Sequence, residues 1–109
     1  MRDATKVRIA LTTAGSMDEA QELASALVER RLAACVNIIP NLTSIYRWQG
    51  AIEETSEILL LMKTTAEQLA AVEAALRELH SYEVPEFLAF NVESGSQPYL
   101  DWLLSSVKA

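Results

Sequence analysis

The stretch ACVNIIPNLTSIYRWQGAIEETSEILLLMKT, residues 34–64, decides the fold of this chain. Its first half is rich in strand-forming residues up to Trp48, and Gln49-Gly50 is typical of a tight turn. Its second half returns as a strand that is polar near the turn and apolar from Ile58 to Met62. Proline is tolerated at a bulge or a sheet edge, so we expect one long strand that bends at Pro40-Asn41. The stretch predicts a long antiparallel hairpin with a polar tip.

Strand and helix patterns alternate on both sides of this hairpin. Residues 6–14 alternate in polarity and predict a strand, and residues 16–19 (SMDE) have the spacing of a capping box that opens a helix. Residues 65–68 (TAEQ) repeat that box ahead of a second helix. Residues 87–93 predict the last strand, and residues 95–98 (GSQP) open a short terminal helix. The order of elements is strand, helix, strand, strand, helix, strand, helix.

This order predicts an α+β fold of the ferredoxin-like type, a split pair of βαβ units. Right-handed crossovers place both main helices on one face of a four-stranded antiparallel sheet, from which the long hairpin projects. The short C-terminal helix carries Tyr99 and Trp102, which we expect on its core-facing side. A length of 109 residues fits a single domain over residues 1–109.

The apolar pattern of two strands indicates an oligomer. Residues 58–62 are apolar on both faces, and so are residues 87–90. The two main helices cover only one face of a sheet, so the other face needs the short C-terminal helix over part of it and a neighbouring subunit over the rest. Symmetry favours a dimer or a closed ring. Tyr46 and Trp48 share one side of the hairpin, where we expect packing in the arm or at the interface.

The composition of the chain argues against two classes of binding partner, nucleic acids and membranes. The net charge is -6 and the longest basic run is Arg30-Arg31, which disfavours nucleic acid. No apolar run approaches the about 18 residues of a membrane span, so we expect no membrane partner. Cys35 is the one cysteine, so no disulfide forms within the chain, and we expect a reducing cytoplasm.

Cys35 and His80 are the first candidates for chemistry. Together they could form a nucleophile pair, but Cys35 lies among small apolar residues of a predicted strand, which is typical of a packed thiol. His80 ends the second helix, where the helix dipole favours a cation. It is therefore either a helix cap or a metal ligand and pH-sensitive group. No standard catalytic motif is present, so the sequence predicts no catalytic residues.

A second group of candidates is charged. Glu53 and Glu57 lie four apart on one strand and share its face, with Lys63 further along the same face. Tyr82 and Glu86 follow the second helix. The first three residues either line a charged groove or form a solvated hairpin edge that discourages aggregation. Tyr82 and Glu86 could form a partly polar pocket beside His80.

Several segments together resemble the CutA family, the divalent-cation tolerance proteins. The resemblance covers almost the whole chain, and it is specific because the segments keep their order and spacing. The segments are RLAACVN (31–37), IP (39–40), TSIY (43–46), W-x-G (48–50), IEE (52–54), SE (56–57), KT (63–64), YEVPE (82–86), and PYL (98–100) with Trp102.

The resemblance implies a cytoplasmic homotrimer of ferredoxin-like subunits, held by strand pairing between subunits and linked to tolerance of divalent metals, copper above all. It implies no established enzyme activity. Bacterial members described as copper-binding use a cysteine at the end of the first strand and a His-His pair after the second helix. The matching positions here are Thr12 and Leu79-His80. The metal-ligand candidates that remain are His80, with glutamates or a neighbour's residues, and Cys35.

Three hypotheses follow. The first is a trimer that responds to divalent metals by binding Cu(II) or another divalent cation near His80, with no other cofactor. The alternative is a signalling or scaffold trimer, similar in fold to PII-type proteins, which binds a small ligand or protein between subunits at Glu57, Lys63, Tyr82 and Glu86. The third is an enzyme that uses Cys35 or His80.

Overall fold

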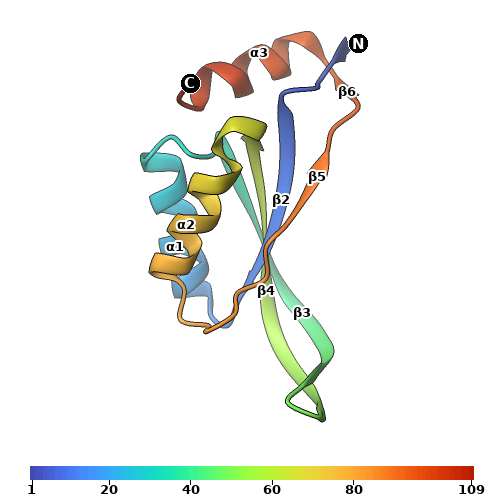
Figure 1. The fold of residues 1–109 in the computed structure, drawn as a ribbon, viewed down its shortest axis with the longest axis vertical. Helices are drawn as coiled ribbons and strands as arrows, with labels where there is room; N and C mark the ends of the chain where they lie inside the picture. Colours follow the sequence, from blue (N-terminus) through green and yellow to red (C-terminus); the bar gives the residue numbers. More distant parts are fainter.

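The computed structural model describes all residues, 1–109, and has the predicted architecture (Figure 1). Its elements are β1 (Arg2–Asp3), β2 (Val7–Ala14), α1 (Met17–Glu29), β3 (Cys35–Trp48), β4 (Ala51–Thr65), the 3-10 turn η1 (Ala66–Gln68), α2 (Leu69–Leu79), β5 (Leu88–Asn91), β6 (Ser94–Gly95) and α3 (Gln97–Ser106). The main sheet has the antiparallel order β3-β4-β2-β5. Helices α1 and α2 lie side by side on one face, which confirms the ferredoxin-like prediction.

The long hairpin is one bent ribbon. Strands β3 and β4 pair from Cys35 and Lys63 as far as the turn, with a register shift between Ile39 and Leu42. The bend falls at the predicted proline, and Asn41 there adopts a positive φ of 64°. Beyond it the hairpin projects from the body, so the molecule measures 45 × 25 × 23 Å. We call this projecting part, residues 42–57, the arm.

The turn at the end of the arm forms where it was predicted. Gln49 and Gly50 both have a positive φ, of 50° and 83°. Two consecutive residues in that conformation are typical of a two-residue hairpin turn whose twist matches the twist of its strands. The arm is therefore closed by a tight turn and not by a flexible loop.

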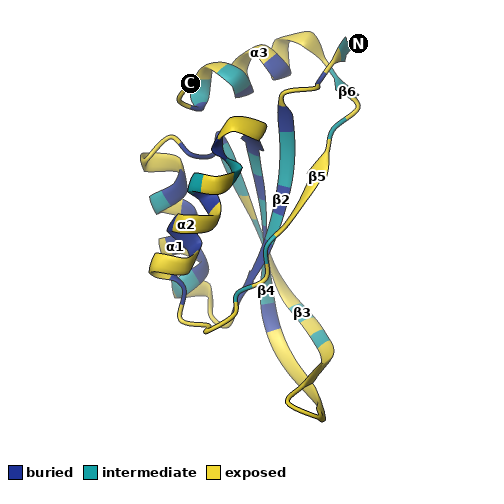
Figure 2. Ribbon diagram, viewed as in Figure 1, coloured by how far each residue is buried: buried dark blue, intermediate teal, exposed yellow.

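The main core lies between the sheet and the two helices. Leu60 and Met62 of β4 are fully buried there, against Leu23, Leu27 and Leu76 of the helices. A smaller cluster lies under α3 at the other end of the sheet and includes buried Leu100 and Leu103. Burial falls off sharply along the hairpin toward the arm (Figure 2).

The prediction for Tyr99 and Trp102 is wrong. Both are exposed by about two-fifths of their surface, because α3 turns Leu100 and Leu103 toward the core instead. Tyr99 packs on Trp102 with ring centroids 5.4 Å apart. The two aromatic rings form a surface pair.

The second face of the sheet is apolar, as the strand patterns indicated. The register places Phe90 beside Ile9, and Leu11 between Leu88 and Leu61, on the face away from α1 and α2. Leu88 is 56% exposed and Phe90 is 49% exposed. The single chain leaves this face uncovered. None of the helices is long and apolar enough to span a membrane.

Two local predictions for the helix starts have different outcomes. Ser16 caps α1, because its Oγ accepts a hydrogen bond from the Glu19 amide at 3.1 Å. Thr65 makes no such bond: it remains in β4, opposite Val7, and η1 leads into α2. The chain ends also pair as the short strands β1 and β6, which the sequence did not indicate.

Candidate functional site

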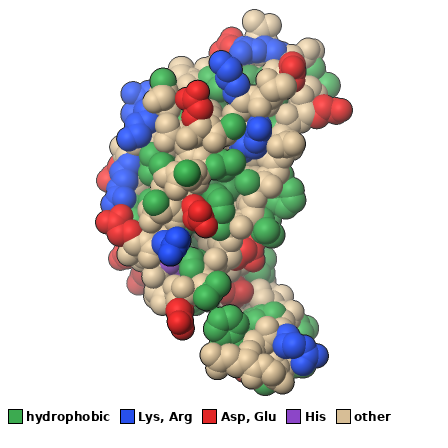
Figure 3. Space-filling view, in the orientation of Figure 1, with side chains coloured by type: hydrophobic (Ala, Val, Ile, Leu, Met, Phe, Trp, Pro, Cys, Tyr) green, Lys and Arg blue, Asp and Glu red, His purple; other side chains and the backbone are tan.

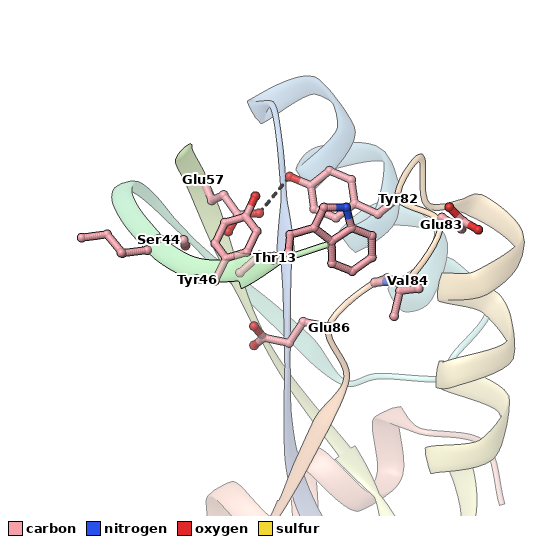
Figure 4. A pocket seen from close by; sticks show the side chains of 11 residues that line it. Thr13, Ser44, Tyr46, Glu57, Tyr82, Glu83, Val84 and Glu86 are labelled. Atoms are coloured by element: carbon pink, nitrogen blue, oxygen red, sulfur yellow. Dashed lines mark hydrogen bonds between the residues drawn. The ribbon is translucent and has the colours of Figure 1, made fainter. Parts of the chain in front are cut away.

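A pocket of about 670 Å³ opens where the arm meets the segment that follows α2 (Figure 4). It lies at the boundary between the packed body and the projecting arm. It is lined by Thr13 of β2, by Ser44, Ile45, Tyr46 and Trp48 of β3, by Glu57 of β4, and by Tyr82, Glu83, Val84, Pro85 and Glu86 of the segment after α2. We call that last segment, residues 82–86, the crossing segment.

Local sequence explains how these side chains come together. Helix α2 ends at His80, whose extended backbone (φ -76°, ψ 142°) turns the chain away from the helix axis. Pro85 keeps the crossing segment from returning to helix, because the residue before a proline avoids that conformation. On β3, Tyr46 and Trp48 are two residues apart and share a face. Beyond the bulge, Leu42 pairs with Glu57, which places Glu57 on that same face.

Glu57 is the central residue of the pocket. It is only 8% exposed, and the Tyr82 hydroxyl donates a hydrogen bond of 2.8 Å to its Oε2. Gly15 leaves room for this hydroxyl, since a Cβ there would lie 3.2 Å from it. Burial raises the pKa of Tyr82 above its ordinary value of 10.0, and the hydrogen bond to Glu57 and its charge raise it further. Tyr82 is therefore the neutral donor in this pair.

The pocket has an unbalanced negative charge. Glu57 forms no ion pair with any lysine, arginine or histidine of the chain, and its Oε1 has no hydrogen-bond partner. Glu83 and Glu86 also line the pocket, and no basic side chain does. A buried carboxylate is stabilised by a cation or by hydrogen bonds to both oxygens. The arrangement is therefore suited to a positively charged ligand.

His80 does not line the pocket but contacts the backbone of two residues that do, Thr13 and Tyr82. Its ring is fully buried; its Nε2 lies 2.6 Å from the Thr13 carbonyl oxygen, and its Nδ1 accepts a hydrogen bond of 3.0 Å from the Tyr82 amide. Because Nδ1 accepts, Nε2 must donate to the carbonyl, which assigns the neutral imidazole with its proton on Nε2. His80 thus links the end of β2 to Tyr82. A metal at His80 would displace one of these two bonds, and that role stays a prediction.

Glu19 of α1 completes this support. Its carboxylate accepts hydrogen bonds from the amide and hydroxyl of Ser81 at 2.8 and 3.0 Å, and lies 3.7 Å from His80 Nδ1. Burial by itself would raise the pKa of Glu19. The two hydrogen bonds from Ser81 favour the charged carboxylate and outweigh burial, so the pKa lies below its ordinary value of 4.5. The charged carboxylate ties the start of α1 to the turn after α2.

Two predicted site residues lie elsewhere. Cys35 pairs with Lys63 of β4, which in turn pairs with Ile9 of β2. His80 contacts Thr13, which lies four residues further along β2, a distance of about 13 Å along a strand. Cys35 is therefore not beside His80, and the two residues form no nucleophile pair. The Lys63 amine lies instead 3.2 Å from the Tyr99 hydroxyl. Within one chain, Lys63 is not part of the pocket that contains Glu57, Tyr82 and Glu86.

Sequence reasoning missed part of the lining. Tyr46 and Trp48 were expected to pack in the arm or at an interface, yet both line the pocket together with Tyr82. The available signal was their two-residue spacing, which puts both rings on the strand face that Leu42 shares with Glu57. No three histidine, cysteine, aspartate or glutamate side chains of the chain lie close enough together to hold one metal ion. The carboxylates instead lie spread around the pocket.

Comparison with known proteins gives a consistent answer. The CutA1 divalent ion tolerance protein family matches residues 8–106. A "Divalent-cation tolerance protein CutA" of Thermus thermophilus is 50% identical over 95 residues, 87% of this chain and 92% of that protein. A mouse "Protein CutA" is 48% identical over 89% of this chain. The mouse protein is longer, and the matched region is only 55% of its length.

A solved structure shows the same fold. The structure of CutA from Synechococcus elongatus superimposes with a TM-score of 0.93 at 45% sequence identity, over 98% of this chain and 95% of that one. Sequence and structure therefore agree along nearly the full length. The chain belongs to the CutA1 divalent ion tolerance protein family.

Proposed function

We propose that this protein acts in the tolerance of divalent cations and that it binds them directly. The names of its relatives support the general role. The observation that supports direct binding is Glu57, a nine-tenths buried carboxylate with no positive partner in the chain. Glu83 and Glu86 add negative charge at the same pocket, at positions too far apart for the three carboxylates to hold one ion together.

The donor chemistry bears on the choice of ion. Carboxylate oxygens suit hard cations such as Mg²⁺ or Mn²⁺, which keep several water ligands. Cu(II) prefers imidazole, and His80 is the one imidazole of the chain. Cys35 is the one thiol and lies at the far end of β3, partly buried. Copper binding near His80 therefore requires donors that a single chain does not bring together.

Calorimetric titration of the metal-free protein with Cu(II) and with Mn²⁺ tests this function. Saturable binding that is lost in Glu57→Gln assigns the ion to the pocket, and binding that is lost in His80→Ala assigns it to the histidine. Glu54→Gln is the matched control, because Glu54 is an exposed neighbour on β4 outside the pocket. No saturable binding of either ion by the parent protein contradicts direct binding.

We further propose a cytoplasmic homotrimer held by strand pairing between subunits, without enzymatic activity. The uncovered apolar sheet face and the projecting arm support this assembly, because both expose surface that a second copy could bury. Sedimentation equilibrium should give three times the chain mass of 12.0 kDa. A monomer at micromolar concentration would contradict it.

A second candidate function is the binding of a small organic ligand in the pocket, as in a signalling or scaffold protein. The observation that favours it is the lining: beside the carboxylates it has three aromatic rings and three aliphatic side chains, far more apolar surface than a metal ion contacts. A saturable rise in melting temperature with an organic compound, and none with metal, would support this function.

A further inference from the structure

We infer that the pocket binds an aliphatic organic cation with two or more ammonium groups, such as a diamine or polyamine. This inference rests on the second candidate function and names the class of ligand. It follows from three properties of the pocket: the sign of its charge, the nature of its walls and the spacing of its carboxylates.

The charge of the pocket selects a cation. Its lining carries three carboxylates, Glu57, Glu83 and Glu86, and no lysine, arginine or histidine. The most buried of them, Glu57, keeps one oxygen free, because Tyr82 donates to the other. An ammonium group has three N–H donors and no acceptor, so it can donate to this free oxygen in a charge-assisted hydrogen bond.

The walls select an organic body over a metal ion. Tyr46, Trp48 and Tyr82 contribute aromatic surface to the lining, and Val84 and Pro85 contribute aliphatic surface. Figure 4 shows the rings of Tyr46 and Tyr82 beside Glu57. Aromatic faces attract ammonium groups through their quadrupole, and aliphatic surface covers methylene groups. A hydrated metal ion uses neither kind of wall. A volume of about 670 Å³ is also that of an organic ligand and not of a single ion.

The spacing of the carboxylates selects more than one positive charge. Glu57 and Glu83 lie on opposite sides of the pocket, with Glu86 below them in the view of Figure 4. They are not grouped closely enough to share one metal ion. A flexible chain with an ammonium at each end can place one charge at Glu57 and the other at the crossing segment, with its methylene groups along the aromatic walls.

The test is a calorimetric titration of the purified full chain in its native assembly. The ligands are 1,4-diaminobutane, spermidine, the neutral isostere 1,4-butanediol, and Mg²⁺ as an inorganic dication. The variants are Glu57→Gln, which keeps the volume and an acceptor for Tyr82, and Trp48→Leu, which removes one aromatic wall. Glu54→Gln, on the same strand but outside the pocket, controls for the loss of one negative charge.

The inference predicts saturable binding of both amines and no binding of the diol. Glu57→Gln should weaken amine binding about tenfold or more, as expected for a charge-assisted hydrogen bond. Trp48→Leu should weaken it about threefold to tenfold, while Glu54→Gln stays within about twofold. Circular dichroism of each variant verifies the fold.

Each other outcome overturns the inference in a different way. Binding of Mg²⁺ without the amines leaves divalent-cation binding in place and removes the organic ligand. Equal binding of diol and diamine shows that charge is not recognised. If Glu54→Gln and Glu57→Gln weaken amine binding equally, the amines respond to the general negative charge of the surface and not to the pocket. If none of these compounds binds, the inference is rejected, and so is the binding of Mg²⁺ by this protein.

Discussion

The two halves of the β3–β4 hairpin have the same secondary structure and opposite surroundings. In the body, Leu60 and Met62 are completely buried beneath α1 and α2. In the arm, Ile45 is 68% exposed and Ile52 is 63% exposed, although both are strong strand formers. The difference shows that one continuous ribbon serves two purposes: its body half holds the fold together, and its arm half presents surface for contact.

The boundary between the halves is where the pocket lies. Glu57 is the last arm residue of β4 before the apolar run, and Tyr82 donates a hydrogen bond to it from the crossing segment. The view in Figure 3 shows the arm end separated from the body by a hollow, with acidic side chains on the body beside it. The polar residues of the pocket therefore lie directly beside the end of the apolar core.

The largest expected effect is the loss of a core side chain in the body. Leu60→Ala should lower the free energy of unfolding by about 3 kcal/mol or more, because it leaves a cavity that the packed helices cannot fill. Ile52→Ala, on the same strand in the arm, should change it by less than about 0.5 kcal/mol in the free chain. Urea denaturation measures both.

This pair of variants also tests the assembly. A large loss in Ile52→Ala that grows with protein concentration would show that another copy covers the arm. Equal losses in both variants at every concentration would contradict the division of the hairpin into body and arm.

The next largest effect lies at the boundary. Tyr82→Phe should destabilise the protein by about 1–2 kcal/mol, because it leaves the buried Glu57 carboxylate without its one hydrogen bond. In a Glu57→Gln background the same change should be milder, since a neutral amide tolerates the loss better. A double-mutant cycle by thermal denaturation measures this coupling, and a coupling of zero would separate the two residues energetically.

A smaller effect, of opposite sign, is expected inside the body. The hydroxyl of Thr12 is fully buried and has no hydrogen-bond partner. Thr12→Val keeps the shape and removes that hydroxyl, so it should stabilise the protein by about 1 kcal/mol. Thr13→Val, the neighbour on the other face of β2, is the control. A destabilised Thr12→Val would mean that the hydroxyl is satisfied in solution.

The smallest expected effect depends on pH. The folded pKa of Glu19 is below its ordinary value of 4.5, so its contribution to stability is complete above that pH. The contribution is lost as the pH falls from 4.5 through the lowered pKa of the folded protein. Glu19→Gln should therefore reduce the acid dependence of the melting temperature between pH 5 and 2. An unchanged pH profile would show that the Ser81 contacts do not hold in solution.

Local patterns in the sequence were enough for most of the fold. Pro40 predicted the bend, Gln49-Gly50 predicted the turn, and Ser16 predicted the start of α1. The same reasoning failed for Thr65, because sheet pairing with Val7 keeps that residue in the strand. It failed for Trp102 because the orientation of α3 depends on the cluster beneath it.

The candidate site was predicted only in part. Glu57, Tyr82 and Glu86 were named from their charge and position, but the bond between Glu57 and Tyr82 joins residues 25 positions apart. Its existence depends on the path of the crossing segment over the end of β2, which no local pattern encodes. Lys63 shares a strand face with Glu57, yet six strand residues place it about 20 Å away. Sharing a face does not mean sharing a site.

The most direct test of the account follows the two tryptophans by nuclear magnetic resonance. Trp48 borders the pocket and Trp102 lies on α3, at the opposite end of the sheet from the arm, so their indole N–H signals report two distant places in one experiment. If the diamine binds in the pocket, titration with 1,4-diaminobutane should give a saturable shift of the Trp48 signal that is lost in Glu57→Gln, with the Trp102 signal unchanged. A shift confined to Trp102, or no shift of either signal, would contradict the claim that the pocket at Glu57 is the cation-binding site.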